Sequence, residues 1–272
     1  MIRMTAPAAA PILNMTREGG GPALILIHGV AGSRRIWDNL APLLAPHFEV
    51  VRLDLLGYGH SPKPATGYTP AGHVEAIRAT LAAQGLKPPY RLVGLSMGCL
   101  LVLEFAQRYP TEVKQVACIG LPYHRSPAEA TRYLSGSFWA GLALKGGAFG
   151  HIAITGGWWV GRHLPWLVGR FTNFYTPAMT LESIMASYRA FYDSLTNCMV
   201  HNRPEPLLAA TVATPQAYLF GSRDRWIDLP AAQAALSAHP NCHVTILPGA
   251  EHNTAVTAPV ATVAWLRQAM AA

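Results

Sequence analysis

The chain has 272 residues, of which 51% are hydrophobic and 13% are charged, and its formal net charge is +7. This composition is typical of a folded protein with a large core, and it excludes an intrinsically disordered chain. The positive charge is scattered, and neither zinc-finger spacing nor an aromatic RNA-binding motif accompanies it, so nucleic-acid binding is not expected.

No stretch of about 18 residues is continuously apolar without Gly or Pro, so no membrane-spanning helix is expected. The first 16 residues contain Pro7 and Pro11 and no sustained apolar run, which makes a poor signal peptide. The four cysteines are far apart and form no metal-ligand pair, so we expect reduced thiols and no metal. These features predict a cytoplasmic protein, and its positive charge leaves peripheral contact with an anionic membrane surface open.

The N-terminal part of the chain alternates strand-like and helix-like segments. Ala23–Ile27 is a continuous apolar run, typical of a strand that is buried on both faces. Such alternation favours βαβ units and a mostly parallel sheet flanked by helices. The predicted elements that follow are a helix over 36–44, strands over 48–53 and 113–119, a helix over 71–84, and a strand at 92–93 that leads into another helix.

The alternation stops in the middle of the chain and resumes later. Residues 122–207 contain glycine pairs, Trp158-Trp159 and one predicted helix, Leu181–Met199. We therefore predict a single core of residues 1–121 and 208–272, with a helical cap or lid inserted at 122–207. The later predicted elements are a strand over 216–220, a helix over 231–238, a strand over 243–247 and a helix over 259–270.

The stretch Gly94-Leu95-Ser96-Met97-Gly98 follows a strand-like run and leads into an apolar helical pattern. A serine between two glycines at a strand-to-helix turn is the layout of a nucleophile elbow, because the turn is too tight for side chains at the flanking positions. The sequence therefore predicts that Ser96 is a catalytic nucleophile.

A serine hydroxyl is a weak nucleophile, and it needs a histidine base that is held by a carboxylate. In open parallel sheets such groups lie just beyond the carboxyl ends of strands. Asp224 follows the predicted strand that ends at Phe220, and His252 follows the one that ends at Leu247. We predict that they complete a triad with Ser96, with Asp228 as the weaker alternative to Asp224.

Backbone N–H groups near the elbow complete the predicted site. Met97 begins the helix after Ser96, so its N–H is unpaired and can bind an oxyanion. The loop His28–Ser33 follows the first buried strand, and its glycines allow a close approach to the elbow, so we assign the N–H of Val30 as the second donor.

These motifs together resemble the α/β-hydrolase superfamily, in particular its cap-bearing group of esterases and C–C bond hydrolases. The matching pieces also include Asp54–Ser61 and Gly221-x-x-Asp224. The resemblance implies that His28 anchors its loop, that Asp54 stabilises its own loop, and that no metal or organic cofactor is needed. Only 22 residues precede Ala23, so the first strand of the family is expected to be missing or short.

The insertion is rich in aromatic residues: residues 122–207 hold 14 of the 25 in the chain. Most of them should pack the insertion onto the core, and a few are expected to form an apolar pocket wall above Ser96. The basic residues Lys145, Arg162 and Arg170 lie among them, which keeps a carboxylate-bearing or membrane-derived substrate open. The candidate substrate-binding residues are Tyr123, Trp139, Trp158, Trp159 and Trp226.

These features predict a serine hydrolase that cleaves a carboxylic ester of a small, largely hydrophobic molecule through an acyl-enzyme. C–C bond hydrolysis of a vinylogous diketone is the alternative, since Asp224-Arg225-Trp226 is similar to a segment of those enzymes. Thioester or lactone cleavage needs the same groups. A ligand receptor that retains the fold without catalysis is the hypothesis from another class of proteins.

Overall fold

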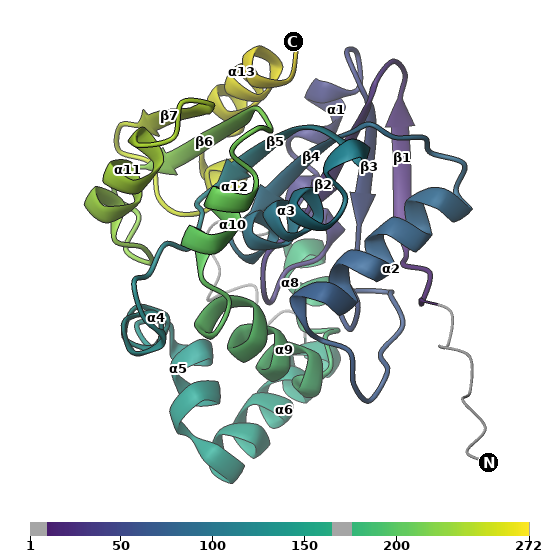
Figure 1. The fold of residues 1–272 in the computed structure, drawn as a ribbon. Coiled ribbons are helices and arrows are strands. Elements are labelled where there is room, and N and C mark those ends of the chain that lie inside the picture. The colour runs from purple at the N-terminus through teal and green to yellow at the C-terminus, as the bar shows by residue number, and fades with distance from the viewer. Residues whose placement is uncertain (1–9, 165–175, 272) are drawn as a thin grey trace, which may run out of the picture.

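A computed structural model of the chain describes residues 10–164 and 176–271. Its strands form one seven-stranded sheet in the order β1-β3-β2-β4-β5-β6-β7 (Figure 1). β1 runs antiparallel to β3, and every other neighbouring pair is parallel, which confirms the predicted sheet. The strands are β1 (Met15–Gly19), β2 (Ala23–Ile27), β3 (Glu49–Leu53), β4 (Tyr90–Leu95), β5 (Val113–Ile119), β6 (Gln216–Gly221) and β7 (Cys242–Leu247).

The two faces of the sheet are covered by different helices because successive strand residues point to opposite sides. In β2, Ile25 and Ile27 belong to a core cluster shared with α2 (Pro70–Ala83), α3 (Met97–Arg108) and α11 (Leu229–Ser237). Leu24 and Leu26 belong to a second cluster shared with α1 (Ala41–Leu44) and α13 (Pro259–Met270). All four side chains are fully buried, which explains why the whole strand is apolar.

The predicted helix over 36–44 is wrong in detail. The chain instead forms a 3₁₀ turn, η1 (Arg34–Trp37), and then the short helix α1. Pro42 lies in the first turn of α1, where its missing N–H costs nothing, whereas within one continuous helix it would remove a hydrogen bond.

Between β5 and β6 the described chain forms helices. Most of them gather at one end of the molecule, below the sheet in Figure 1, whereas α10 lies against α3. The predicted single helix Leu181–Met199 is wrong, because α8 ends at Ser183 and a new helix begins after Ser187. The Ser187 backbone is extended, and its hydroxyl accepts a hydrogen bond from the N–H of Ala190, so it caps the new helix. The elements are α4 (Pro127–Leu134), α5 (Phe138–Lys145), α6 (Gly147–His163), α8 (Pro177–Ser183), α9 (Tyr188–Ser194), the π-helical turn η3 (Leu195–Val200) and α10 (Pro204–Ala210).

Short elements complete the fold: η2 (Pro110–Glu112) precedes β5, and α12 (Thr254–Thr257) precedes α13. Within the described residues, none of the helices combines the length and the apolar character needed to cross a bilayer.

Candidate active site

Ser96 lies at the sharp turn between β4 and α3, with backbone angles φ 54° and ψ −120°. A non-glycine residue rarely adopts this conformation, and such strain is typical of functional positions. The flanking glycines are required by close backbone contacts. A Cβ on Gly94 would lie 2.4 Å from the carbonyl of Gly98, and a Cβ on Gly98 would lie 2.3 Å from the Ile27 oxygen. The G-x-S-x-G pattern is therefore explained by sterics.

Asp224 and His252 form a hydrogen-bonded pair beyond the ends of β6 and β7. His252 Nδ1 lies 2.6 Å from Asp224 Oδ2, and the Asp224 side chain is fully buried. The second carboxylate oxygen accepts a hydrogen bond of 2.9 Å from the backbone N–H of Trp226. This arrangement holds the carboxylate in place, orients the imidazole and leaves Nε2 available to accept a proton.

The alternative acid, Asp228, has a different role in the structure. Its Oδ1 accepts a hydrogen bond from the N–H of Ala231 and caps α11, and its Oδ2 pairs with Arg125. The carboxylate that contacts His252 is thus that of Asp224.

Gly120 is a site residue that the sequence analysis missed. It follows β5 with φ 62°, and a Cβ there would lie 3.0 Å from both Cε1 and Nδ1 of His252. The imidazole therefore rests against bare backbone at the end of β5. The sequence signal was a glycine directly after the strand. It was missed because Gly120 contributes to the site through its lack of a side chain.

A cavity of about 410 Å³ contains Ser96 and His252 in its wall. Its lining comes from the loop after β2, the ends of β4 and β5, and the helices between β5 and β6. Apart from His252, none of the lining residues described carries a titratable charge. The lining includes Val30, Ile36, Leu134, Trp139, Trp158, Met179, Ile184, Phe191, Leu195, Met199 and Trp226.

The predicted oxyanion donors lie beside Ser96. Met97 is the first residue of α3, so its N–H has no partner within the helix. Val30 lines the cavity in a turn in which Gly32 N–H donates to Gly29 O and Ala31 has φ 53°. A Cβ on Gly29 would lie 3.0 Å from Ser96 Cβ, so only glycine lets this loop pass so close to the elbow.

His28 and Asp54 anchor that loop rather than line the cavity. Buried His28 accepts a hydrogen bond of 2.9 Å at Nε2 from the N–H of Leu55. Burial lowers the pKa of His28, which keeps the ring neutral and able to accept this bond. Asp54 accepts hydrogen bonds from the backbone N–H groups of Arg34 and His60. Burial acts to raise the pKa of Asp54, but these bonds outweigh it and hold the pKa below its ordinary value.

Glu182 is a second residue that the sequence analysis missed. It lies on α8 and is 5% exposed. Its carboxylate binds Arg34 Nη1 at 2.7 Å and Arg35 Nε at 2.6 Å, on the 3₁₀ turn that directly follows the Val30 loop. The ion pairs thus tie α8, which lines the cavity, to the segment that carries a predicted oxyanion donor. A lone glutamate in the sequence gave no signal for this long-range contact.

Comparison with known proteins agrees with this architecture. A family model described as the alpha/beta hydrolase fold matches residues 22–144. Over 119 residues the chain is 31% identical to the probable lysophospholipase BODYGUARD 1 of Arabidopsis thaliana, which covers 41% of this chain and 25% of that protein. It is 22% identical to the monoacylglycerol lipase abhd6-B of Xenopus laevis over 262 residues, 89% of this chain and 73% of that one. Among solved structures, E-2-(acetamidomethylene)succinate hydrolase superposes with a TM-score of 0.75 at 22% identity, covering 96% of this chain and 95% of that one.

The chain has the α/β-hydrolase fold. The order of its strands, the strained turn at Ser96 and the match to the family model agree on this fold. The matched part of BODYGUARD 1 is about a quarter of that protein, so the likeness concerns the core around the elbow.

In this α/β-hydrolase fold, three of the five candidate substrate-binding residues line the cavity: Trp139, Trp158 and Trp226. The other two candidates lie outside the cavity wall. Tyr123 is 6% exposed and belongs to the core rather than to the cavity wall, and Trp159 is 61% exposed on the outer side of α6. Adjacent residues of a helix point in different directions, so Trp158 and Trp159 could not both face the cavity.

Arg162 and Lys145 do not line the cavity either. The Arg162 guanidinium donates to the backbone carbonyls of Ile184 and Ala186, and Lys145 is exposed at the end of α5. Arg170 lies outside the described residues.

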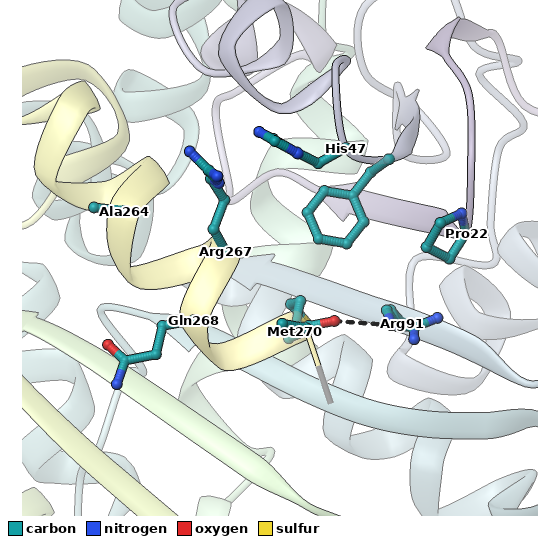
Figure 2. Close-up of a pocket in the computed structure, with 9 residues that line it drawn as sticks. Pro22, His47, Arg91, Ala264, Arg267, Gln268 and Met270 are labelled. Carbon is teal, nitrogen blue, oxygen red and sulfur yellow. Dashed lines mark hydrogen bonds between the residues drawn. The ribbon is translucent and has the colours of Figure 1, made fainter.

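A second cavity of about 560 Å³ lies at the opposite, amino-terminal edge of the parallel strands (Figure 2). There Arg91 Nε donates to the backbone oxygen of Met270. The lining of this second cavity contains none of the predicted site residues.

Proposed function

We propose that this α/β-hydrolase cleaves carboxylic esters of neutral, largely apolar molecules through a serine acyl-enzyme. One observation carries the proposal. Ser96, in its strained turn, and His252, which is paired with Asp224, line one cavity beyond the carboxyl ends of the strands. These two residues are 156 positions apart in the sequence.

The proposed mechanism has two stages. His252 Nε2 takes the Ser96 proton as Oγ attacks the ester carbonyl, and the N–H groups of Met97 and Val30 stabilise the oxyanion. The buried Asp224 carboxylate stabilises the imidazolium that forms. His252 then returns the proton to the departing alcohol, and water hydrolyses the acyl-enzyme with the same groups.

The cavity wall supports a neutral substrate. A carboxylate buried there would have no cationic partner among the described lining residues, and an unpaired buried charge is costly. The many aliphatic and aromatic side chains favour an acyl chain or ring. The lipase and lysophospholipase names of two similar proteins agree with such a substrate.

The helices between β5 and β6 act as the cap of this site in our proposal, with residues 122–207 as the insertion. Leu134, Trp139, Trp158 and Phe191 all reach the cavity from these helices, which supports the assignment.

The test is turnover of p-nitrophenyl esters of graded chain length, beside labelling with a serine-directed phosphonate. We expect the wild type to hydrolyse the esters and to be labelled, and Ser96→Ala to lose both. Ser237→Ala, an exposed serine on α11, is the matched control and should retain both. Absence of labelling in the wild type would favour the receptor hypothesis, and labelling without ester turnover would favour C–C bond hydrolysis.

A matched pair of esters tests whether the pocket prefers a neutral substrate. The p-nitrophenyl ester of hexanoic acid and the mono-p-nitrophenyl ester of adipic acid have similar lengths, but the second carries a carboxylate at its end. We expect kcat/KM to be about 100-fold higher for the hexanoate, equivalent to about 2.7 kcal/mol for an unpaired charge. Equal values would contradict a neutral-substrate pocket.

A further inference from the structure

Helices α5 and α6 carry large apolar side chains that point to solvent. Phe138 on α5 is 72% exposed, and Phe149, Ile152 and Trp159 on α6 are 73%, 70% and 61% exposed. The two helices lie at the outer end of the helical segment, away from the sheet (Figure 1). We call these four residues the apolar rim.

The rim residues of α6 form a stripe along one side of the helix. Phe149, Ile152 and Trp159 are spaced by three and seven residues, which places them on one face. The opposite side, with Ile154 and Trp158, is buried in the core. A helix that packs on a core normally has a polar outer face, so a second apolar face indicates a partner.

The charge around the rim indicates what kind of partner fits. From Ala130 to Leu181 the sequence contains no Asp or Glu, whereas it contains Arg132 on α4 and Lys145 on α5. Lys145, at the end of α5, is exposed. An apolar stripe whose sequence neighbours from 130 to 181 include cations but no acids suits an anionic lipid surface, in which rings enter the interface and lysines reach the headgroups. A symmetric contact between the rims of two copies would bring two Lys145 side chains toward each other, which like charges oppose.

The rim is continuous with the cavity. Trp139 is 41% exposed, and its ring meets that of Phe138 edge to face at 5.1 Å. The same tryptophan lines the cavity that contains Ser96 and packs against Gly157 of α6. An apolar path therefore leads from the outer surface of α5 to the predicted nucleophile.

We propose that the apolar rim docks this protein on anionic phospholipid bilayers, with α5 and α6 lying in the plane of the interface. Tryptophan, as at Trp159, is favoured at this depth because its ring is apolar and its N–H can reach water, while Phe138, Phe149 and Ile152 supply apolar area. Docking would place the Trp139 side of the cavity next to the lipid, so that an apolar ester could enter without crossing water.

The experiment is co-sedimentation with vesicles of phosphatidylcholine alone and of equal parts phosphatidylcholine and phosphatidylglycerol, at low and high salt. We expect the wild type to bind the anionic vesicles more tightly, and salt to reduce this preference. Phe149→Ser/Ile152→Ser should weaken binding about tenfold or more. The matched control is Val260→Ser, because Val260 is 74% exposed on α13, outside the rim, and its loss should leave binding unchanged.

Further measurements separate docking from folding, catalysis and self-association. The rim variant should keep the wild-type unfolding midpoint, and Ser96→Ala should bind vesicles like the wild type, because docking needs no chemistry. Failure of the wild type to bind either vesicle, or wild-type binding by the rim variant, would overturn the proposal. So would a wild-type dimer in sedimentation velocity that the rim variant dissociates, since the rim would then be a contact between copies.

Discussion

At the residue scale, the pairing of Asp224 with His252 makes a sharp prediction. Asp224→Asn keeps the shape of the side chain but removes the charge that orients and stabilises the imidazole, so we expect kcat to fall about 10⁴-fold. Asp228→Asn is the control, because Asp228 caps α11 and contacts Arg125 instead. Steady-state kinetics with a p-nitrophenyl ester measure both. Equal losses in the two variants would mean that Asp224 acts only through stability.

Gly29 gives a second prediction at this scale. A Cβ added at Gly29 would lie 3.0 Å from both Ser96 Cβ and the Leu95 oxygen. The substitution Gly29→Ala must therefore displace either the loop or the nucleophile. We expect kcat/KM to fall about 100-fold, because a shift of about 1 Å in a reacting group costs this much. Gly20→Ala is the matched control, since nothing lies within 4 Å of a Cβ there. Wild-type kinetics in Gly29→Ala would show that the loop yields freely.

The site residues differ in how far they could be predicted from the sequence. The position of Ser96 between Gly94 and Gly98 was readable, because a local turn imposes the pattern. Asp224 and His252 were readable because each directly follows a strand. Gly120 and Glu182 were missed, since their partners are 132 and 148 residues away and only the folded chain brings them together.

At the element scale, Glu182 joins α8 to the turn after the Val30 loop. Its carboxylate is 7% exposed, and both arginines that it binds are partly shielded from water. Glu182→Gln removes the counter-charge that Arg34 and Arg35 share and leaves only Asp38 beside Arg35, so we expect the free energy of unfolding to fall by about 2 kcal/mol. Glu112→Gln, which breaks the more exposed pair with Arg78, should cost about 0.5 kcal/mol.

Urea unfolding measures these losses, and hydrogen exchange of the α8 amides locates them. We expect faster exchange over Pro177–Ser183 in Glu182→Gln and unchanged exchange there in Glu112→Gln. The same loss of stability in both variants would contradict a buried tether.

The helices between β5 and β6 were also the least predictable elements. Their apolar residues suit a helical cap, but a single helix over 181–199 was expected where the chain forms α8, α9 and η3. The break occurs at Ser187, whose hydroxyl caps α9 by accepting a hydrogen bond from the N–H of Ala190. The Ser187 N–H donates to the Gly57 carbonyl of a distant loop. The helical pattern continues across the break, so only the Ser187 cap and this tertiary contact mark it.

At the scale of the whole molecule, buried histidines should make the fold sensitive to acid. Burial lowers the pKa of His73 to about 3 and that of His124 to about 4. Their folded-state pKa values lie below the unfolded value of about 6.5, so the unfolded chain binds more protons in between. The contribution of each neutral ring to the free energy of unfolding is therefore fully present above the unfolded pKa, and it is lost as the pH falls from there toward the folded pKa.

Between pH 7.5 and 5, we expect His73 to account for a loss of about 2 kcal/mol in the free energy of unfolding. His73→Gln removes this titration, so its loss over the same range should be smaller than that of the wild type by about that amount. His47→Gln, at an exposed position, is the control. Urea titrations at the two pH values give the comparison, and parallel pH dependences of wild type and His73→Gln would contradict it.

The position of β7 has a consequence for how heat should inactivate the protein. β7 is the outermost strand beside β6, and its residues are half-buried or exposed, whereas β6 is wholly buried. Outer strands open at a lower free energy than central ones. His252 follows this strand, while Ser96 follows the central β4. On warming, the base should detach while the rest of the sheet persists, so turnover should cease several degrees before the helical circular dichroism signal is lost.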